Sequence, residues 1–258
     1  VYCIIIILHV NSCEKYRGGR MDKKRLNIAL LVSEFEDGYT RSLCEGAVSA
    51  AKELDANLFI FPGRYLEAHN YDLYRTKYDY HFNSLFSYAT ASEYDAILIS
   101  MGTIAGNVDL ETKVEFLRQF KGDNIITISA KIEGYPSVCF DNSSGFYKGI
   151  SHLIEAHKCR RIGFVSGAMT SDDAMQRLDT YRKCLRDHGI TYQEGRVVYG
   201  NFTEYSQEIV RDLMRRNPDL DAVVFANDMM AIGGYKVFRE MGLRVGRDIS
   251  VMGFDNSA

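Results

Sequence analysis

The sequence predicts an α/β fold in which parallel strands alternate with helices. Short apolar runs rich in Val and Ile recur along the chain, and between them hydrophobic residues are spaced three or four apart. Near the end, two such runs at 222–226 and 249–253 flank a helical pattern that follows Asn227. A right-handed crossover places the carboxyl ends of two parallel strands on one edge of the sheet. Asn227 and Asp255 each follow a strand, and open α/β sheets bind ligands at this edge.

The remaining elements continue the alternation from residue 26 onward. Residues 26–32 form an unbroken apolar run, which is typical of a strand covered on both faces. No G-x-G-x-x-G follows this run, which argues against a dinucleotide-binding turn. Further strands are predicted at 58–61, 96–100, 125–129, 138–140, 162–166 and 197–199. Helices are predicted around 43–54, 67–90, 110–117, 143–154, 175–185, 203–216 and 228–241, with Asp228 as an N-cap and Gly189 and Gly242 as helix stops.

One predicted helix carries an aromatic stripe. Tyr71, Tyr74 and Tyr78, together with Phe82 and Leu85, recur three or four residues apart. Such a stripe could form a ligand surface or a dimer surface, but a helix that covers a sheet is the commoner explanation. We therefore expect these side chains to pack in the core.

The composition excludes several classes of function. The net charge is −3, the pI is near 6.1 and no stretch clusters Lys and Arg, so this chain alone is a poor candidate for binding DNA. The six cysteines are scattered, which favours free thiols. His152 and His157 are five apart and would not share a helix face, so we expect neither a metal nor a cofactor. No nucleophile elbow or P-loop is present, so an enzyme is not expected.

The first twenty residues do not follow the pattern of the rest of the chain. The apolar run at 4–8 is too short to span a membrane, and no convincing signal peptide surrounds it. Met21 and the residues after it resemble an ordinary start. We interpret residues 1–20 as a leader or a fragment edge, and we expect a cytoplasmic protein without a membrane partner.

The motifs carry a resemblance to a known family. The segments VFANDMMAIGG and GLRVGRDISVMGFDN resemble the matching segments of LacI/GalR-family effector domains, which look like type I periplasmic sugar-binding proteins. The likeness extends to PSVCFDNSSGFYKGISHLIEAHKCRRIGFVSG and QRLDTYRKCLRDHGI, and it covers the chain from about residue 26. It implies two lobes, each a parallel sheet flanked by helices, with a boundary at Asp141: an N-terminal lobe at 21–141 and a C-terminal lobe at 142–258. It also implies that a segment returning to the first lobe is missing after the GFD motif.

The resemblance also implies where a ligand binds. Sugars are held by side chains that pair with adjacent hydroxyls and by an aromatic ring against their apolar face. Arg177 resembles the cleft arginine of the family, and its planar fork can bridge two ligand oxygens. Phe202 and Tyr39 stand where family members place cleft aromatics, and Asp141 lies at the crossover between the lobes. The predicted ligand-binding residues are thus Tyr39, Asp141, Arg177, Phe202, Asn227 and Asp255.

Taken singly, most of these residues also have structural explanations. Asn227 could be a turn residue, and for Phe202, Tyr39 and Asp141 core packing or a hinge is the commoner explanation. Asp255 and Arg177 lie within the strongest motif matches, which favours function. Thr180 stands where the family commonly has Gly, so the packing of that helix is expected to differ.

The sequence thus favours a sensing domain in a LacI-type regulator or signalling protein. Its effector is expected to be a small molecule, a sugar or a nucleoside-like compound, with a sugar as the first expectation. The resemblance implies that such a domain is dimeric. It also implies that DNA is bound by a separate helix-turn-helix domain, and the residues before the first strand show no pattern of two helices. The input domain of a diguanylate cyclase or histidine kinase sensor is an alternative. A secreted sugar-transport binding protein is a further alternative, and it would need an export signal.

Overall fold

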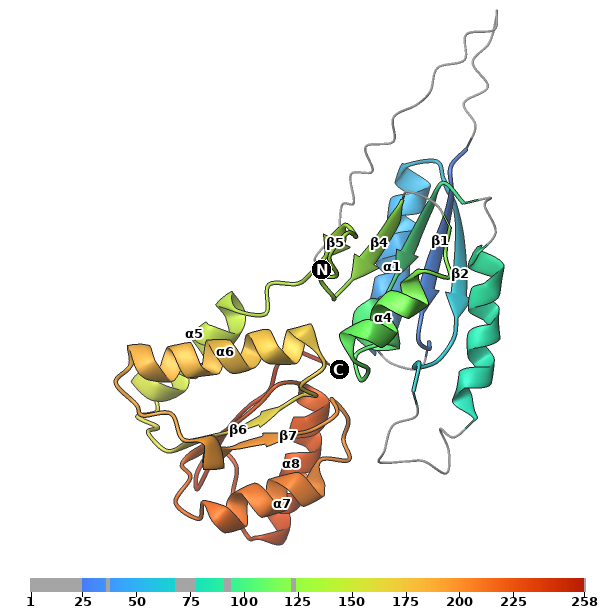
Figure 1. Ribbon diagram of the computed structural model, residues 1–258. Helices are drawn as coiled ribbons and strands as arrows, with labels where there is room; N and C mark the ends of the chain where they lie inside the picture. The colour runs from blue at the N-terminus through green and yellow to red at the C-terminus, as the bar shows by residue number, and fades with distance from the viewer. Residues whose placement is uncertain (1–24, 36–37, 68–77, 91–93, 122–123, 258) are drawn as a thin grey trace, which may run out of the picture.

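The chain forms two lobes, each built on its own parallel sheet (Figure 1). The computed structural model describes residues 25–35, 38–67, 78–90, 94–121 and 124–257. The first sheet has the strand order β2-β1-β3-β4-β5, and the second has the order β7-β6-β8-β9. Every described pairing is parallel, as the alternation of strands and helices predicts.

The first lobe contains the elements up to the crossover. Its strands are β1 (Asn27–Val32), β2 (Asn57–Pro62), β3 (Ala96–Ile99), β4 (Ile125–Ile128) and β5 (Ser137–Val138). Its helices are α1 (Gly38–Glu53), the 3₁₀ helix η1 (Asp79–Thr90), the short α3 (Met101–Ile104) and α4 (Leu110–Leu117). The sequence pattern did not predict α3, which is only four residues long.

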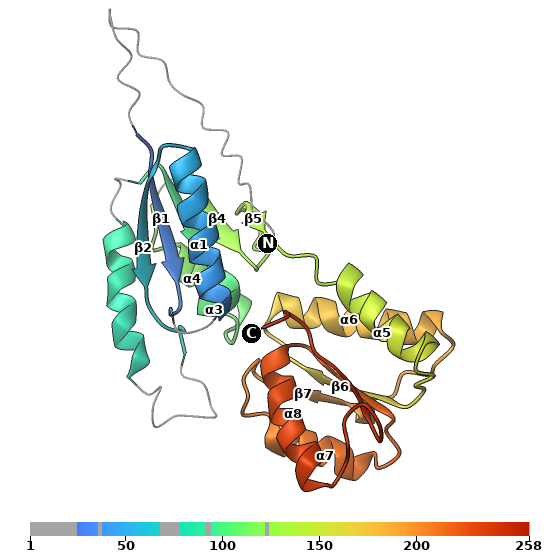
Figure 2. The ribbon, with the colours of Figure 1, turned by 180° about the vertical axis from the view of Figure 1, so that it is seen from behind.

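Helices cover both faces of the first sheet, which explains the unbroken apolar run of β1. Ala29 and Leu31 pack with Phe86 of η1 and Phe116 of α4 on one face. Leu30 and its neighbours pack beneath α1 on the other face, and Figure 2 shows α1 on the side opposite α4. Because successive strand residues point to opposite faces, a strand buried on both sides needs apolar residues at every position.

The second lobe repeats the arrangement. Its strands are β6 (Ile162–Ser166), β7 (Val197–Tyr199), β8 (Ala222–Phe225) and β9 (Ser250–Met252). Its helices are α5 (Ser144–Glu155), α6 (Asp172–Asp187), the 3₁₀ helix η2 (Glu194–Arg196), α7 (Gln207–Arg216) and α8 (Asp228–Glu240). Helices α5 and α6 lie on one face of the sheet, and α7 and α8 lie on the other (Figures 1 and 2). Gly189 and Gly242 adopt the left-handed conformation predicted for the ends of α6 and α8.

Three details correct the predictions. The N-cap of α8 is Asn227, whose side chain accepts a hydrogen bond from the Met230 N–H, and Asp228 is the first helical residue. Helix α7 begins at Gln207, with Ser206 at its N-cap, rather than near residue 203. The strand predicted at 138–140 is β5 at Ser137–Val138, so it ends two residues earlier than predicted.

The predicted burial of the aromatic stripe is wrong for the part that the structure describes. Tyr78 is 61%, Phe82 is 52% and Leu85 is 36% exposed, whereas Phe86 and Ala89 of η1 face the core. Tyr71 and Tyr74 lie outside the described residues. The helix buries a different face from the one predicted, since a 3₁₀ helix repeats every three residues rather than every 3.6.

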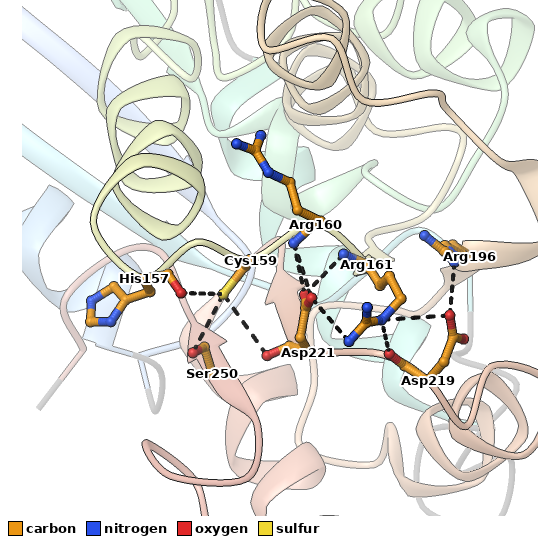
Figure 3. Close-up of polar contacts among 8 residues, drawn as sticks. All are labelled: His157, Cys159, Arg160, Arg161, Arg196, Asp219, Asp221 and Ser250. Carbon is orange, nitrogen blue, oxygen red and sulfur yellow. Dashed lines mark hydrogen bonds and ion pairs between the residues drawn. The ribbon is translucent and has the colours of Figure 1, made fainter.

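The turn between α5 and β6 is tied to the start of β8. The Asp221 carboxylate accepts hydrogen bonds from the backbone N–H groups of Arg160 and Arg161 at 2.9 to 3.1 Å, as Figure 3 shows. The Arg161 guanidinium in turn donates to the carbonyl of Asp219. These bonds satisfy the backbone where the chain enters β6 and fix the pairing of β6 with β8.

Two further expectations concern the cysteines and the membrane. The thiols of Cys44, Cys139, Cys159 and Cys184 are free, as predicted, and Cys3 and Cys13 lie outside the described residues. Within the described part of the chain, no helix is both long and apolar enough to span a bilayer.

Candidate functional site

Arg177 lies at the centre of a buried polar network in the second lobe. Its side chain extends from the first half of α6, and the residue is only 6% exposed. Nε and one terminal nitrogen both donate to the Asn142 Oδ1, at 3.0 and 2.8 Å, and the other terminal nitrogen donates to the Ala226 carbonyl at 2.6 Å. Burial lowers the pKa of the Arg177 guanidinium, and the nearby carboxylates Asp255 and Asp173 oppose that effect.

Two aromatic rings flank this guanidinium. Its central carbon lies 4.4 Å from the centroid of the Phe254 ring and 5.8 Å from that of Phe202. The Phe202 ring packs on Gly167 so closely that a Cβ at this glycine would lie 2.1 Å from the ring. A side chain at residue 167 would therefore displace Phe202 from its place beside Arg177.

Asp255 is the most exposed member of the group. One carboxylate oxygen lies 3.7 Å from the Arg177 guanidinium, and 40% of the side chain is accessible to solvent. Burial raises the pKa of Asp255 to about 6, although Arg177 lowers it, and the carboxylates of Asp228 and Asp173 raise it further. Among the described residues no hydrogen bond reaches this carboxylate, so its oxygens are available as acceptors.

The backbone before Asp255 depends on glycine. A Cβ at Gly253 would lie 2.0 Å from an Asp228 carboxylate oxygen. The other oxygen of that carboxylate accepts a hydrogen bond from the Ser257 N–H, and the Asp228 N–H donates to the Phe254 carbonyl. The start of α8 thus holds the segment that carries Phe254 and Asp255.

Asn227 uses its side chain within the protein. Its oxygen caps α8, and its Nδ2 donates to the Phe202 carbonyl at 2.9 Å. The residue is 7% exposed. The bond to Phe202 helps to hold this residue in its left-handed conformation, with its ring beside Arg177. In this geometry Asn227 positions Phe202.

The remaining predicted residues lie apart from Arg177. Tyr39 is on α1 of the first lobe, where its hydroxyl is 3.0 Å from the Ser129 Oγ and its ring packs edge-on against Phe140. The Asp141 carboxylate accepts hydrogen bonds from the backbone N–H groups of Ser143 and Ser144 at the start of α5. Hydrogen bonds from Ser144 and Ser143 lower the pKa of Asp141. The geometry therefore brings four of the six predicted residues together: Arg177, Phe202, Asn227 and Asp255.

Three members of the group were not predicted. Asn142 anchors Arg177 and donates through Nδ2 to the Asp173 carboxylate at 2.7 Å. Burial raises the pKa of Asp173 above its usual range, against the opposing effect of Arg177 and Asn142. Phe254 supplies the nearer aromatic ring. Asn142 and Phe254 are sequence neighbours of the predicted residues Asp141 and Asp255. The motifs therefore located the right segments, but they did not show which of two adjacent residues contacts Arg177.

The loop before α6 connects the two lobes. Lys113 of α4 is 6% exposed, and its Nζ donates to the Thr170 carbonyl at 2.7 Å. The Thr170 hydroxyl donates to the Gly106 carbonyl, and the Lys131 N–H donates to the Asp172 carboxylate at 2.9 Å. Thr170 lies just before α6, and Asp172 is the first residue of α6, the helix that carries Asp173 and Arg177. A movement between the lobes would therefore act directly on α6.

The predicted departure at Thr180 is accommodated locally. Thr180 is buried, and its hydroxyl donates to the Gln176 carbonyl one turn earlier at 2.7 Å. Because this bond satisfies the hydroxyl within α6, the helix accepts a larger residue than glycine at this position.

The first lobe has an apolar groove between α1 and its sheet. The lining includes Leu43, Ala47, Leu58 and Leu98, and its polar side chain is that of Ser42. A groove with so few hydrogen-bonding groups suits an apolar partner rather than a sugar. In the described residues no group of three or more His, Cys, Asp or Glu side chains is arranged to hold a metal ion.

The chemistry of the Arg177 network is that of polar recognition. A guanidinium carries five N–H groups, and the described hydrogen bonds use three of them. The two that remain, together with the accepting oxygens of Asp255, can pair with neighbouring hydroxyls of one ligand. The flanking phenylalanine rings offer apolar surfaces. A guanidinium, a carboxylate and an aromatic ring together form the kind of surface that binds sugars.

Parts of the chain are similar to known proteins. Residues 150–258 match the family of periplasmic binding protein-like domains. Over 121 residues, 46% of this chain, the chain is 37% identical to the HTH-type transcriptional regulator CelR of Thermobifida fusca. Over 123 residues, 47% of the chain, it is 36% identical to the regulator AscG of Escherichia coli K12. The matched segments make up only 35% and 36% of those two proteins, about a third of their length.

Solved structures share the fold over most of the chain. A CelR–cellobiose complex superposes with a TM-score of 0.72 and 26% identity, covering 90% of this chain and 69% of that protein. The Lac repressor dimer bound to operator and an anti-inducer has a TM-score of 0.70 at 20% identity, covering 92% and 77% of the two chains, and it supports the fold alone. The chain thus has the two-lobed architecture of LacI-type effector domains, and the relatives named here are transcriptional regulators.

Proposed function

Because residues 150–258 match the periplasmic binding protein-like domain family and the similar proteins are HTH-type transcriptional regulators, we propose that the chain senses a sugar between its lobes. The lobes divide at Asp141, with residues 21–141 in the first and 142–258 in the second. Bound sugar contacts both lobes and favours one arrangement of them over the other. A ligand shifts such an equilibrium only by its differential affinity for the two arrangements.

The observation that carries this proposal is the placement of Asp255 against Arg177. Three parts of the chain meet there: Arg177 comes from α6, Asp255 follows β9, and Phe202 follows β7. Two open guanidinium N–H groups and an open carboxylate on one edge of the sheet fit a pair of adjacent hydroxyls. Tyr39 and Asp141 would complete the contacts from the first lobe and the crossover.

The loop before α6 would transmit the signal. Two hydrogen bonds join the lobes there, beside the Arg177 network. The Thr170 hydroxyl donates to the Gly106 carbonyl, and the Lys131 N–H donates to the Asp172 carboxylate. A sugar that moves Arg177 would move α6 and thereby alter these contacts. In this account the domain has no catalytic residue, and its output is the arrangement of the lobes.

The partners of the chain follow from the same proposal. DNA would be bound by a separate domain of a cytoplasmic regulator, since this chain has no basic surface motif of its own. The chain would pair with a second copy through its first lobe. The edge strand β2 exposes Phe59, which is 43% accessible, and η1 exposes Phe82 and Tyr88 nearby.

Calorimetric titration with cellobiose, maltose, ribose and adenosine tests the sugar proposal. The expected result is saturable binding of one of the three sugars, weakened at least about tenfold in Asp255→Asn by loss of a charged hydrogen-bond acceptor. Asp248→Asn is a matched control, because Asp248 pairs with the exposed Arg244 beyond α8, away from the Arg177 network. Binding of adenosine alone would indicate a nucleoside sensor. Absence of any binding, or equal binding by Asp255→Asn, would contradict the proposal.

A further inference from the structure

His152 and His157 form an imidazole pair on the surface of the second lobe. Their Nε2 atoms lie 3.2 Å apart, and their ring planes are inclined at 78°. The sequence spacing predicts that the two rings lie on different faces of one helix. They meet because α5 ends at Glu155, so that His157 lies beyond the helix and does not follow its repeat.

The separation of the two nitrogens suits a shared metal ion. A Zn–N bond to histidine is about 2.0–2.1 Å long, so two such ligands at a tetrahedral angle have nitrogens about 3.3 Å apart. As free imidazoles, one Nε2 must donate and the other accept. In the tautomer in which both rings carry their proton on Nδ1, both Nε2 lone pairs are free, and a divalent ion would bind them after small rotations of the two rings. Both residues are exposed, so an ion can reach them.

The surroundings define what kind of site this is. The Cys159 thiol points toward Asp221 and Ser250, while the His157 ring points away from it (Figure 3). Glu155 pairs with His188. In the described chain no third His, Cys, Asp or Glu joins the two histidines. Water would fill the other coordination positions, as it does in open metal sites. The carboxyl end of α5 adds a negative potential, which the Lys158 ammonium partly offsets because it donates to the Glu155 carbonyl at 2.7 Å.

We propose that His152 and His157 bind one divalent transition-metal ion of the class that prefers imidazole: Zn²⁺, Ni²⁺ or Cu²⁺. The ion is held by the two Nε2 atoms and by water. The pair lies where the chain enters β6, whereas Arg177 and Asp255 lie beyond the carboxyl ends of the strands. Metal binding is therefore independent of sugar binding and does not rest on the proposed function.

Calorimetric titration with Zn²⁺ and with Ni²⁺, without sugar, tests this inference in the wild-type chain and in His152→Ala, His157→Ala and His81→Ala. His81 is an exposed histidine of the first lobe and provides the matched control. Loss of a partner that merely supports a metal ligand lowers affinity about 10–100-fold, so loss of either imidazole should weaken the shared site at least about tenfold. His81→Ala should leave that site unchanged.

A second readout separates this site from other histidines. In long-range ¹H–¹⁵N spectra, Zn²⁺ should shift the Nε2 signals of His152 and His157 together and at equal ion concentrations. Melting temperatures in EDTA establish that the variants are folded. Wild-type affinity in either His152→Ala or His157→Ala, or Nε2 signals that stay unchanged at saturating Zn²⁺, would overturn the inference.

Discussion

Arg177 and Asn142 are joined by two hydrogen bonds that end on a single oxygen, the Asn142 Oδ1, at 3.0 and 2.8 Å. Asn142 is the first residue of the second lobe in the proposed division, and Arg177 lies on α6. The bond pair therefore ties the crossover between the lobes to the helix that carries the proposed ligand contact. Since Ala226 also accepts from Arg177, the same side chain reaches the end of β8.

Replacing Arg177 with Met should destabilise the fold. Asn142 Oδ1 and the Ala226 carbonyl would lose donors in a buried setting, and unsatisfied groups of this kind cost about 1–3 kcal/mol each. We expect the free energy of unfolding to fall by about 2–4 kcal/mol in urea denaturation, after partial relaxation around the site. Arg186→Met on the exposed side of the same helix should change it by less than about 0.5 kcal/mol. Equal effects of the two substitutions would show that the network contributes little.

Sugar affinity should fall as the pH drops through about 6. The pKa of Asp255 is raised to about 6 in the free protein, chiefly by burial. Ligand hydroxyls donate to the carboxylate and favour its ionised form, so the complex has a lower pKa than the free protein. Affinity is then complete above this range and is lost as Asp255 takes up a proton. Titrations with sugar between pH 5 and 8 measure this affinity. In Asp255→Asn the affinity should not change over this range, because the titrating carboxyl is absent. A wild-type affinity that rises on acidification contradicts the assignment.

Asn227→Ala should be more damaging than Asn227→Ser. Alanine removes both the cap of α8 and the bond to the Phe202 carbonyl, which together are worth about 1–3 kcal/mol. Serine keeps a capping oxygen and loses the Nδ2 donor. Thermal unfolding of the two variants compares these costs. If alanine and serine lower the melting temperature equally, capping by Asn227 does not stabilise the chain.

A charge placed on the exposed face of η1 should separate a dimer. Tyr88 is 67% exposed on this helix, so Tyr88→Glu costs the folded monomer little. A buried, unpaired carboxylate at an interface is strongly unfavourable. Sedimentation equilibrium should give a dimer for the wild type and a monomer for Tyr88→Glu, while Tyr205→Glu in the second lobe should remain dimeric. A wild-type monomer, or a Tyr88→Glu dimer of unchanged affinity, would show that η1 is not the interface.

The fold was largely predictable because its strands are short apolar runs with clear ends. Residues 222–225 and 250–252 form the parallel pair that the strand, helix, strand pattern predicts. The aromatic stripe was misjudged because periodicity alone cannot tell a 3₁₀ helix with exposed rings from an amphipathic α-helix. The spacing of the histidines also hid the meeting of His152 and His157, because a helical repeat does not apply to His157, which lies beyond the end of α5 at Glu155.

The site was predicted less completely than the fold. Motifs located the segments that meet around Arg177, since each follows a strand or opens a helix. They could not show whether Asp141 or Asn142 turns inward, because adjacent side chains at the start of a helix point in different directions. Nor could they show that the Asn227 amide is already occupied by Met230 and Phe202. Those facts depend on side-chain geometry brought together by distant parts of the chain.

Hydrogen exchange with and without the sugar that gives the largest heat in the calorimetric panel tests the central claim most directly. A ligand held between the lobes protects amides at the strand ends of both lobes, around Ser33 and Ser129 in the first and around Phe254 and Asp255 in the second. We predict protection in both sets, and its loss in Asp255→Asn at the same sugar concentration. Protection confined to one lobe, or no protection by any sugar of the panel, would contradict the account of a sugar sensor that closes around its ligand.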